Sequence, residues 1–127
     1  MEINLRKTKM ILLPILMCIG ALTACAKQVS FSQAVMPILE HRCLACHRVG
    51  AEGYEISGFS VESYEALIRG TKYGPVIEPG YSYASTLQVL ISHRSDPAIA
   101  MPRATTPLTK VEIETIGTWI DQGALDN

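Results

Sequence analysis

The sequence predicts an all-α fold. Four segments place apolar residues at the three- and four-residue spacing of a helix face. No segment shows the sustained alternation of apolar and polar residues that is typical of a half-buried strand. Stretches rich in glycine and proline separate the helical segments and force turns between them. We therefore expect about four helices joined by long loops.

The first predicted helix runs from about Ser32 towards residue 43. Val35, Ile38 and Leu39 share one face at helical spacing and should point inward. Pro37 lacks a backbone donor, so it should kink this helix or mark its true beginning. The following stretch, VGAEGYEISG, holds three glycines and is predicted to be a loop.

Two further helices are predicted in the middle of the chain. The first spans 60–69, is capped by Ser60 and ends before Gly70. The second spans about 82–93. The inward-facing residues are expected to be Val61, Tyr64, Leu67 and Ile68 in the first and Ala84, Leu87, Leu90 and Ile91 in the second.

The last predicted helix has the clearest boundaries. Thr109 and Glu112 have the spacing of a capping box, which satisfies two backbone donors at a helix start. Gly123 can end the helix. Its buried stripe is expected to comprise Ile113, Ile116, Trp119 and Ile120.

The first 24 residues are predicted to be an export signal. A basic start precedes the apolar stretch MILLPILMCIGALTA, which is shorter than the roughly 18 residues that span a bilayer. The stretch leads into LTAC, which resembles the bacterial lipoprotein box, so cleavage before Cys25 and lipidation of its sulfur are expected. Residues 25–30 would then form a short tether and residues 31–127 the domain.

The location of the exported protein has two interpretations. Lipid on Cys25 would anchor it to the periplasmic side of a bacterial membrane. Ala26 lacks the aspartate associated with inner-membrane retention. The tripeptide Ala24-Cys25-Ala26 also fits an ordinary signal-peptidase site, which would release a soluble periplasmic protein.

Composition bounds the domain and its partners. The 127 residues leave room for one compact domain, and 11 Lys and Arg nearly balance 12 Asp and Glu. No basic block follows residue 10, so a nucleic-acid partner is not expected. A small domain with short helices buries a modest fraction of its surface. A large apolar group at its centre would relieve this shortage.

Residues 43–47 read C-x-x-C-H, the attachment motif of haem c. On a helical turn, residues three apart lie on the same face, so Cys43 and Cys46 can both reach one porphyrin edge. His47 can then bind the iron. Export fits this chemistry, because haem is joined to the motif outside the cytoplasm. We expect one covalent haem c with its iron.

Three other interpretations of this motif compete. A redox dithiol of the thioredoxin type lies at a strand-to-helix junction, and no strand is predicted. A structural zinc ion needs four ligands, and besides the motif only His41, His93 or a carboxylate remains, at no usual spacing. A disulfide between Cys43 and Cys46 would close a very short loop and stabilise little.

Met101 is the candidate for the second axial ligand. It lies in the irregular stretch RSDPAIAMPRATTP, where packing of a helix face does not explain a methionine. A thioether ligand raises the potential of the iron relative to two histidines. His93, at the end of a predicted helix, is the competing ligand. We expect His41 to be exposed and Met36 to belong to the core.

Four segments occur in an order typical of a known family: VMPILEHRCLACH, IEPGYSYASTL, the MP of residues 101–102, and LTKVEIETIGTWIDQGA. In this order they resemble the class I cytochrome c domains, and most closely the planctomycete-type cytochrome c module. The resemblance covers about residues 31–125.

The resemblance implies a small cytochrome c fold around one haem, with the first and last helices crossing. It implies thioethers at Cys43 and Cys46, with His47 and Met101 as axial ligands. The loop EPGYSYAS would line the haem edge. The residues suggested near a propionate are Tyr81, Tyr83 and Ser85.

These expectations favour a one-electron carrier rather than an enzyme, because protein ligands would fill both axial positions. Its partners would be redox proteins that donate and accept the electron. The alternative is a haem-based sensor or binder of small ligands, in which the sixth ligand is labile.

Overall fold

The computed structural model describes residues 27–103 and 105–127, and every regular element among them is a helix. The predicted all-α fold is therefore confirmed. One isolated bridge between Thr71 and Gly74 is the sole β pairing in this part of the chain. The elements are the π-helical turn η1 (Phe31–Val35) and the α-helices α1 (Met36–Arg42), α2 (Glu52–Ser57), α3 (Tyr64–Arg69), α4 (Thr86–Ile91) and α5 (Lys110–Asp121).

Pro37 marks the start of regular α-helix, as the sequence predicts. The chain enters through η1, where the Ser30 side chain accepts a hydrogen bond from Gln33 N at 3.2 Å. α1 then begins at Met36, with proline in its first turn, where the missing donor costs nothing. Val35 and Leu39 are buried on the inward face, and Ile38 is half-buried.

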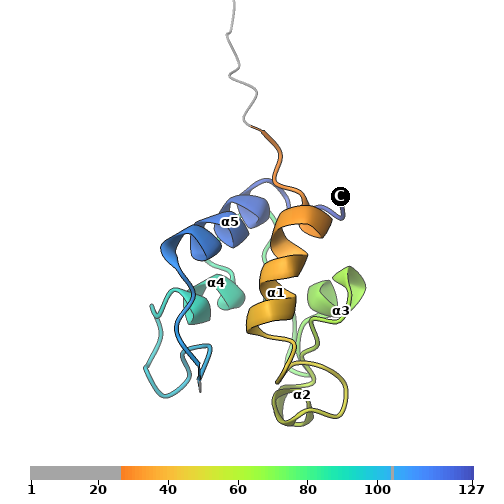
Figure 1. The fold of residues 1–127 in the computed structure, drawn as a ribbon, viewed down its shortest axis with the longest axis vertical. Coiled ribbons are helices and arrows are strands. Elements are labelled where there is room, and N and C mark those ends of the chain that lie inside the picture. The colour runs from red at the N-terminus through yellow and green to blue at the C-terminus, as the bar shows by residue number, and fades with distance from the viewer. Residues whose placement is uncertain (1–26, 104) are drawn as a thin grey trace, which may run out of the picture.

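The first and last helices meet, as expected. α5 packs against η1 beside the central helix α1 (Figure 1). The rings of Phe31 and Trp119 lie 5.4 Å apart, and Tyr64 meets Phe31 edge-on at 5.3 Å. Trp119 is fully buried, and its indole nitrogen donates to Leu125 O at 2.9 Å. Three aromatic residues therefore join η1, α3 and α5.

The capping box of α5 is present in full. Thr109 Oγ1 accepts from Glu112 N at 3.2 Å, and the Glu112 carboxylate accepts from Thr109 N at 2.7 Å. Of the stripe predicted for this helix, three members are buried and Ile113 is half-buried. Gly123 follows the helix with a positive φ of 103°, which suits its predicted role at the end.

The predicted loop at 49–58 is wrong, because it contains α2. Glycine disfavours helix locally, so the sequence pattern favours a loop. Tertiary contact reverses that preference: Tyr54 N donates to Cys46 O at 3.1 Å, which ties the new helix to the preceding turn. Gly58, at φ 72°, ends it in the left-handed conformation.

The two middle helices begin later than predicted. Ser60 is buried, and its hydroxyl donates to the Glu62 carboxylate and accepts from Glu62 N, which forms a turn. Ser63 caps α3 instead. Residues 82–85 form turns, because Ser82 N and Oγ both donate to the Asp121 carboxylate. Ala84 was expected inside but is exposed there.

The described part of the expected tether, residues 27–30, is hydrogen bonded to the end of the chain. Gln122 accepts from Val29 N at 2.7 Å and donates to Lys27 O at 3.2 Å. Asn127 accepts from Phe31 N at 2.7 Å and donates to Val29 O at 3.2 Å. Residues 27–31 and the C-terminus therefore lie together at one end of the described part of the chain (Figure 1).

The predicted signal at 1–24 and the lipid acceptor Cys25 lie outside the described residues. Within the part of the chain that the structure describes, no helix combines the length and the apolar character that membrane crossing requires.

Candidate functional site

Residues 43–47 form a helical turn directly after α1. Cys43 N donates to Leu39 O at 2.8 Å, which continues the helical bonding of α1. Cys46 N and His47 N both donate to Cys43 O, at 3.1 and 2.9 Å. These are the bonds of one turn, so the two cysteines lie on the same face, as the three-residue spacing predicts.

Both thiols are free, but their environments differ. Cys46 is exposed, whereas Cys43 is half-buried. Burial raises the pKa of Cys43 to about 11, and the nearby Arg42 charge opposes this only in part. A redox dithiol needs a thiolate at neutral pH, so this environment disfavours a thioredoxin-like role. The described residues also lack the strand-to-helix junction on which such motifs lie.

His47 presents one nitrogen inward. Its Nδ1 atom is buried without a hydrogen-bond partner, and its ring lies edge-on against Phe59 at 5.3 Å. Burial lowers the pKa of His47, which the Phe59 backbone partly opposes. The lowered pKa favours the neutral ring, which is the form that binds metals. With Nδ1 turned inward, Nε2 is the nitrogen that can bind one.

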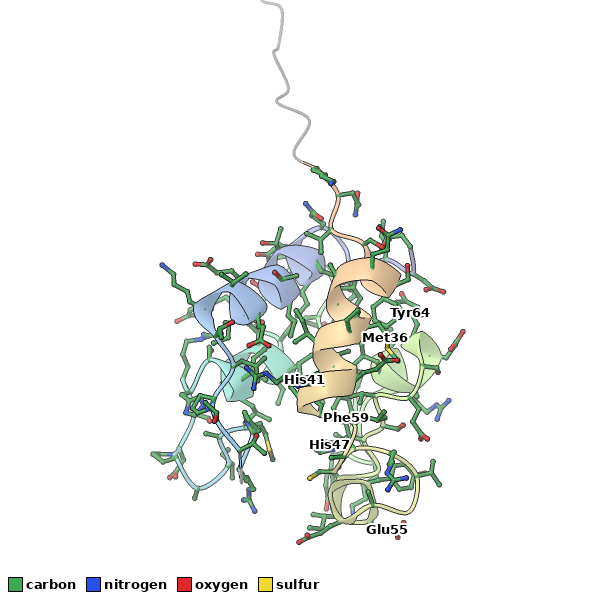
Figure 2. The ribbon with its side chains drawn as sticks, viewed as in Figure 1. Met36, His41, His47, Glu55, Phe59 and Tyr64 are labelled. Atoms are coloured by element: carbon green, nitrogen blue, oxygen red, sulfur yellow. The ribbon has the colours of Figure 1, made fainter. Side chains whose placement is uncertain are left out.

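Backbone contacts hold the His47 turn from two sides. Val61 N donates to His47 O at 2.9 Å, and Tyr54 N donates to Cys46 O. Figure 2 shows His47 and Phe59 together below the lower end of α1, with Glu55 of α2 further down. α2 and the stretch before α3 therefore support the turn.

Gly53 allows this close approach. A Cβ atom there would lie 2.7 Å from Cys46 O and 2.9 Å from His47 Cε1. Any other residue would push the histidine ring or the turn aside. Sequence reasoning missed Gly53 and Phe59, because the helix that brings Gly53 to the turn was itself not predicted. The glycine in AEGYEIS was visible, but only the fold shows what it contacts.

Met101 comes from the long loop between α4 and α5. It is half-buried and packs against the core, and its backbone N donates to Leu90 O at 3.2 Å. The described residues of this loop, 92–103 and 105–108, lie toward the lower end of the view, as does the turn after α1 (Figure 1). The chain thus brings Met101 and His47 to the same end of the molecule from different elements.

His93, the competing ligand, and His41 are both exposed. His41 is exposed near the end of α1, as expected. His93 has a positive φ of 55° and lines an open hollow of about 470 Å³ beside the Met101 loop. The other residues of this hollow are Pro97, Ala98, Ala100, Pro102 and Arg103.

Of the three residues suggested near a propionate, Ser85 is already hydrogen bonded within its own loop. Ser85 is buried, and its hydroxyl accepts from Glu78 N at 2.8 Å and donates to Tyr81 O at 3.0 Å. This hydroxyl therefore shapes its own loop. Tyr81 and Tyr83 are exposed, and Arg94 lies 4.4 Å over the Tyr83 ring.

Among residues 27–103 and 105–127, no three His, Cys, Asp or Glu side chains form a group that could hold a metal ion. The site instead offers two thiols on one turn and an imidazole whose buried nitrogen is orphaned. It also has a glycine that leaves room for the imidazole. This combination fits a covalently attached haem.

Comparison with known families agrees. Residues 43–104 match the model of a family described as Planctomycete cytochrome C. The matched residues, just under half of the chain, are consistent with a planctomycete-type cytochrome c module. No curated protein and no solved structure shows significant similarity to the chain. The match begins at Cys43, the first residue of the C-x-x-C-H motif, and ends within the loop that carries Met101.

This similarity points to a covalent haem c with its iron and to electron transfer. Cys43 and Cys46 are both present and free for attachment. Cytochrome c domains are typically exported from the cytoplasm. η1, α1 and α5 lie outside the matched residues, and η1 packs against both of these helices.

Proposed function

We propose that this chain is an exported, mono-haem c-type cytochrome that carries one electron at a time between partner proteins. One observation supports this most: the Cys43–His47 turn presents two thiols on one face and an imidazole with Nδ1 turned inward. This is the arrangement that covalent attachment and ligation from one side require.

Each site residue has a defined role in this proposal. Cys43 and Cys46 form the two thioethers. His47 binds the iron through Nε2, and Met101 binds it from the opposite side. Haem c held in this way supplies one-electron exchange. Since the chain fills both axial positions, it leaves no position for a substrate.

The proposed location follows from the N-terminal sequence. Residues 1–24 act as the export signal, and lipid on Cys25 anchors the protein on the periplasmic side of the membrane. Mass spectrometry of the mature N-terminus distinguishes a lipidated Cys25 from a soluble form cleaved after Ala26.

The axial ligand is tested by substitution to leucine, which removes the sulfur but keeps the side-chain volume. Met101→Leu should retain covalent haem on a denaturing gel but lose the far-red band of sulfur-ligated ferric haem. Met36→Leu is the matched control, because Met36 is also half-buried against the core. A far-red band that survives Met101→Leu would contradict the assignment.

Two further measurements separate the alternatives. Wild-type protein made in cells that mature c-type haem should be coloured and should stain for haem after denaturation. Colourless protein would favour a simple disulfide lipoprotein. Carbon monoxide should leave the spectrum of the reduced protein unchanged, and rapid binding would favour a sensor with a labile sixth ligand.

A further inference from the structure

The Glu112 carboxylate connects two distant parts of the chain. It accepts from Arg42 Nε at 2.8 Å and from Arg42 Nη2 at 2.9 Å, a two-pronged ion pair. The same carboxylate accepts from Thr109 N at 2.7 Å. The side chains of Arg42 and Glu112 are only 17% and 19% exposed, so water screens this pair less than a surface pair.

The two partners of Glu112 lie next to the two segments that carry the proposed iron ligands. Arg42 is the last residue of α1 and directly precedes Cys43. Thr109 is the N-cap of α5, where the Met101 loop ends. One carboxylate therefore joins the attachment turn to the end of the loop that carries the proposed second ligand.

We propose that Glu112 is a positioning residue: the bridge Arg42–Glu112–Thr109 fixes the Met101 loop relative to the attachment turn and so keeps the Met101 sulfur on the iron. This inference rests on the proposed His47 and Met101 ligation. Glu112 itself does not contact the haem in this proposal.

Helix capping alone does not account for the contacts of Glu112. A capping box needs an acceptor for Thr109 N, and glutamine can supply that acceptor as well. The paired bonds to Arg42 are additional and directional, because the guanidinium fork fits a carboxylate in one geometry. They cross 70 positions in the sequence and link α1 to α5.

The Met101 loop needs such a fixed point. The described residues of this loop, 92–103 and 105–108, contain no helix or strand that would fix their position. The loop is tied near its middle by Met101 N to Leu90 O at 3.2 Å. At its far end the buried Leu108 and the bonded Thr109 hold it. Loosening that end should let Met101 leave the iron more often.

Glu112→Gln tests the bridge, because glutamine keeps the capping acceptor but loses the charge and the two-pronged acceptor. We expect haem to stay attached and the far-red band to weaken. Imidazole binding to the ferric protein should become about tenfold faster, the equivalent of about 1.4 kcal/mol. Arg42→Lys keeps the charge without the fork, so its effect should be smaller.

Glu114→Gln is the matched control on the same helix. Its ion pair with Lys110 spans 3.6 Å, and the two side chains are 61% and 87% exposed, respectively. This variant should leave both the band and the rate of imidazole binding unchanged. The double variant Arg42→Leu/Glu112→Gln should be no worse than Arg42→Leu alone, since both changes break one bridge.

The proposal would be overturned if Glu112→Gln lowered the melting temperature but kept the wild-type far-red band and the wild-type rate of imidazole binding. Glu112 would then only stabilise the helix start. If Glu112→Gln yields no haem-loaded protein, the far-red band and the rate of imidazole binding are measured on Arg42→Lys instead, and wild-type values there would overturn the proposal. A wild-type protein without a far-red band would instead contradict the Met101 ligation, which is a distinct result.

Discussion

Gly53 sets how closely α2 can approach the turn that carries His47. At most helical positions alanine is more favourable than glycine by about 0.5–1 kcal/mol. Here that gain is opposed, because the added Cβ would meet a backbone oxygen at 2.7 Å and the imidazole at 2.9 Å. A backbone atom has little freedom to move away, so the steric cost of the added Cβ should exceed the gain in helix propensity.

Gly53→Ala is expected to destabilise the protein by about 1–3 kcal/mol, the usual cost of overpacking. It should also reduce the yield of covalent haem by displacing His47. Denaturant unfolding and haem staining measure the two effects. Glu55→Ala is the control, since Glu55 is exposed on the same helix. Unchanged stability of Gly53→Ala would contradict the close packing described for this turn.

Single residues also show the limit of local patterns. The C-x-x-C-H motif was identified from five consecutive residues, because attachment depends only on their spacing. Phe59 and the orphaned Nδ1 of His47 could not be identified in this way. Their contact joins residues twelve positions apart, and only the folded chain brings them together.

Among the elements, α1 and α5 were predicted best. Their boundaries depend on signals within a few residues, namely Pro37 and the Thr109–Glu112 capping box. α2 was missed and α4 was placed too early, because contacts with residues outside each segment, such as Cys46 and Asp121, define them. Propensity is a weak guide where tertiary contacts decide.

The link between α1 and α5 should make stability depend on pH. Arg42 lowers the pKa of Glu112 to about 2 from the ordinary 4.5, mainly through their hydrogen bonds. A carboxylate with a lowered folded-state pKa contributes stability above its unfolded pKa and loses it as pH falls. The contribution should therefore be complete above about pH 5 and should disappear progressively towards pH 2.

Denaturant unfolding at a series of pH values between about 5 and 2 measures this loss. Wild type should lose more stability over that interval than Glu112→Gln, which has no charge to neutralise. Glu62 and Glu65 also have lowered pKa values, through hydrogen bonds to nearby groups, so both proteins should lose some stability. Parallel curves for the two proteins would contradict the role of this pair.

At the scale of the whole molecule, two regions lie at opposite ends of the described chain. Residues 27–31 with their bonds to Gln122 and Asn127 lie at one end, and the Cys43–His47 turn lies at the other (Figure 1). Between them the core is a small cluster around Trp119, Leu39 and Leu67. So small a core buries limited apolar surface, which makes a bound haem an important part of the folded state.

Removal of the attachment site should therefore unfold much of the domain. Cys43→Ala/Cys46→Ala is expected to lose covalent haem and about 3 kcal/mol or more of stability, the effect of losing a tightly held ligand. Circular dichroism and thermal melting measure the loss. Wild type made without haem maturation should behave in the same way. Native helicity and melting temperature in both samples would show that haem contributes little to folding.

The helical class, the attachment motif and the last helix were readable from the amino-acid order, because each depends on spacings of three or four residues. Tertiary contacts placed α2 beneath His47, bound residues 27–30 to Gln122 and Asn127, and joined Arg42 to Glu112. The first joins residues eight positions apart, and the other two join residues 70 or more positions apart. No local periodicity carries such information, because long-range contacts depend on how the elements pack.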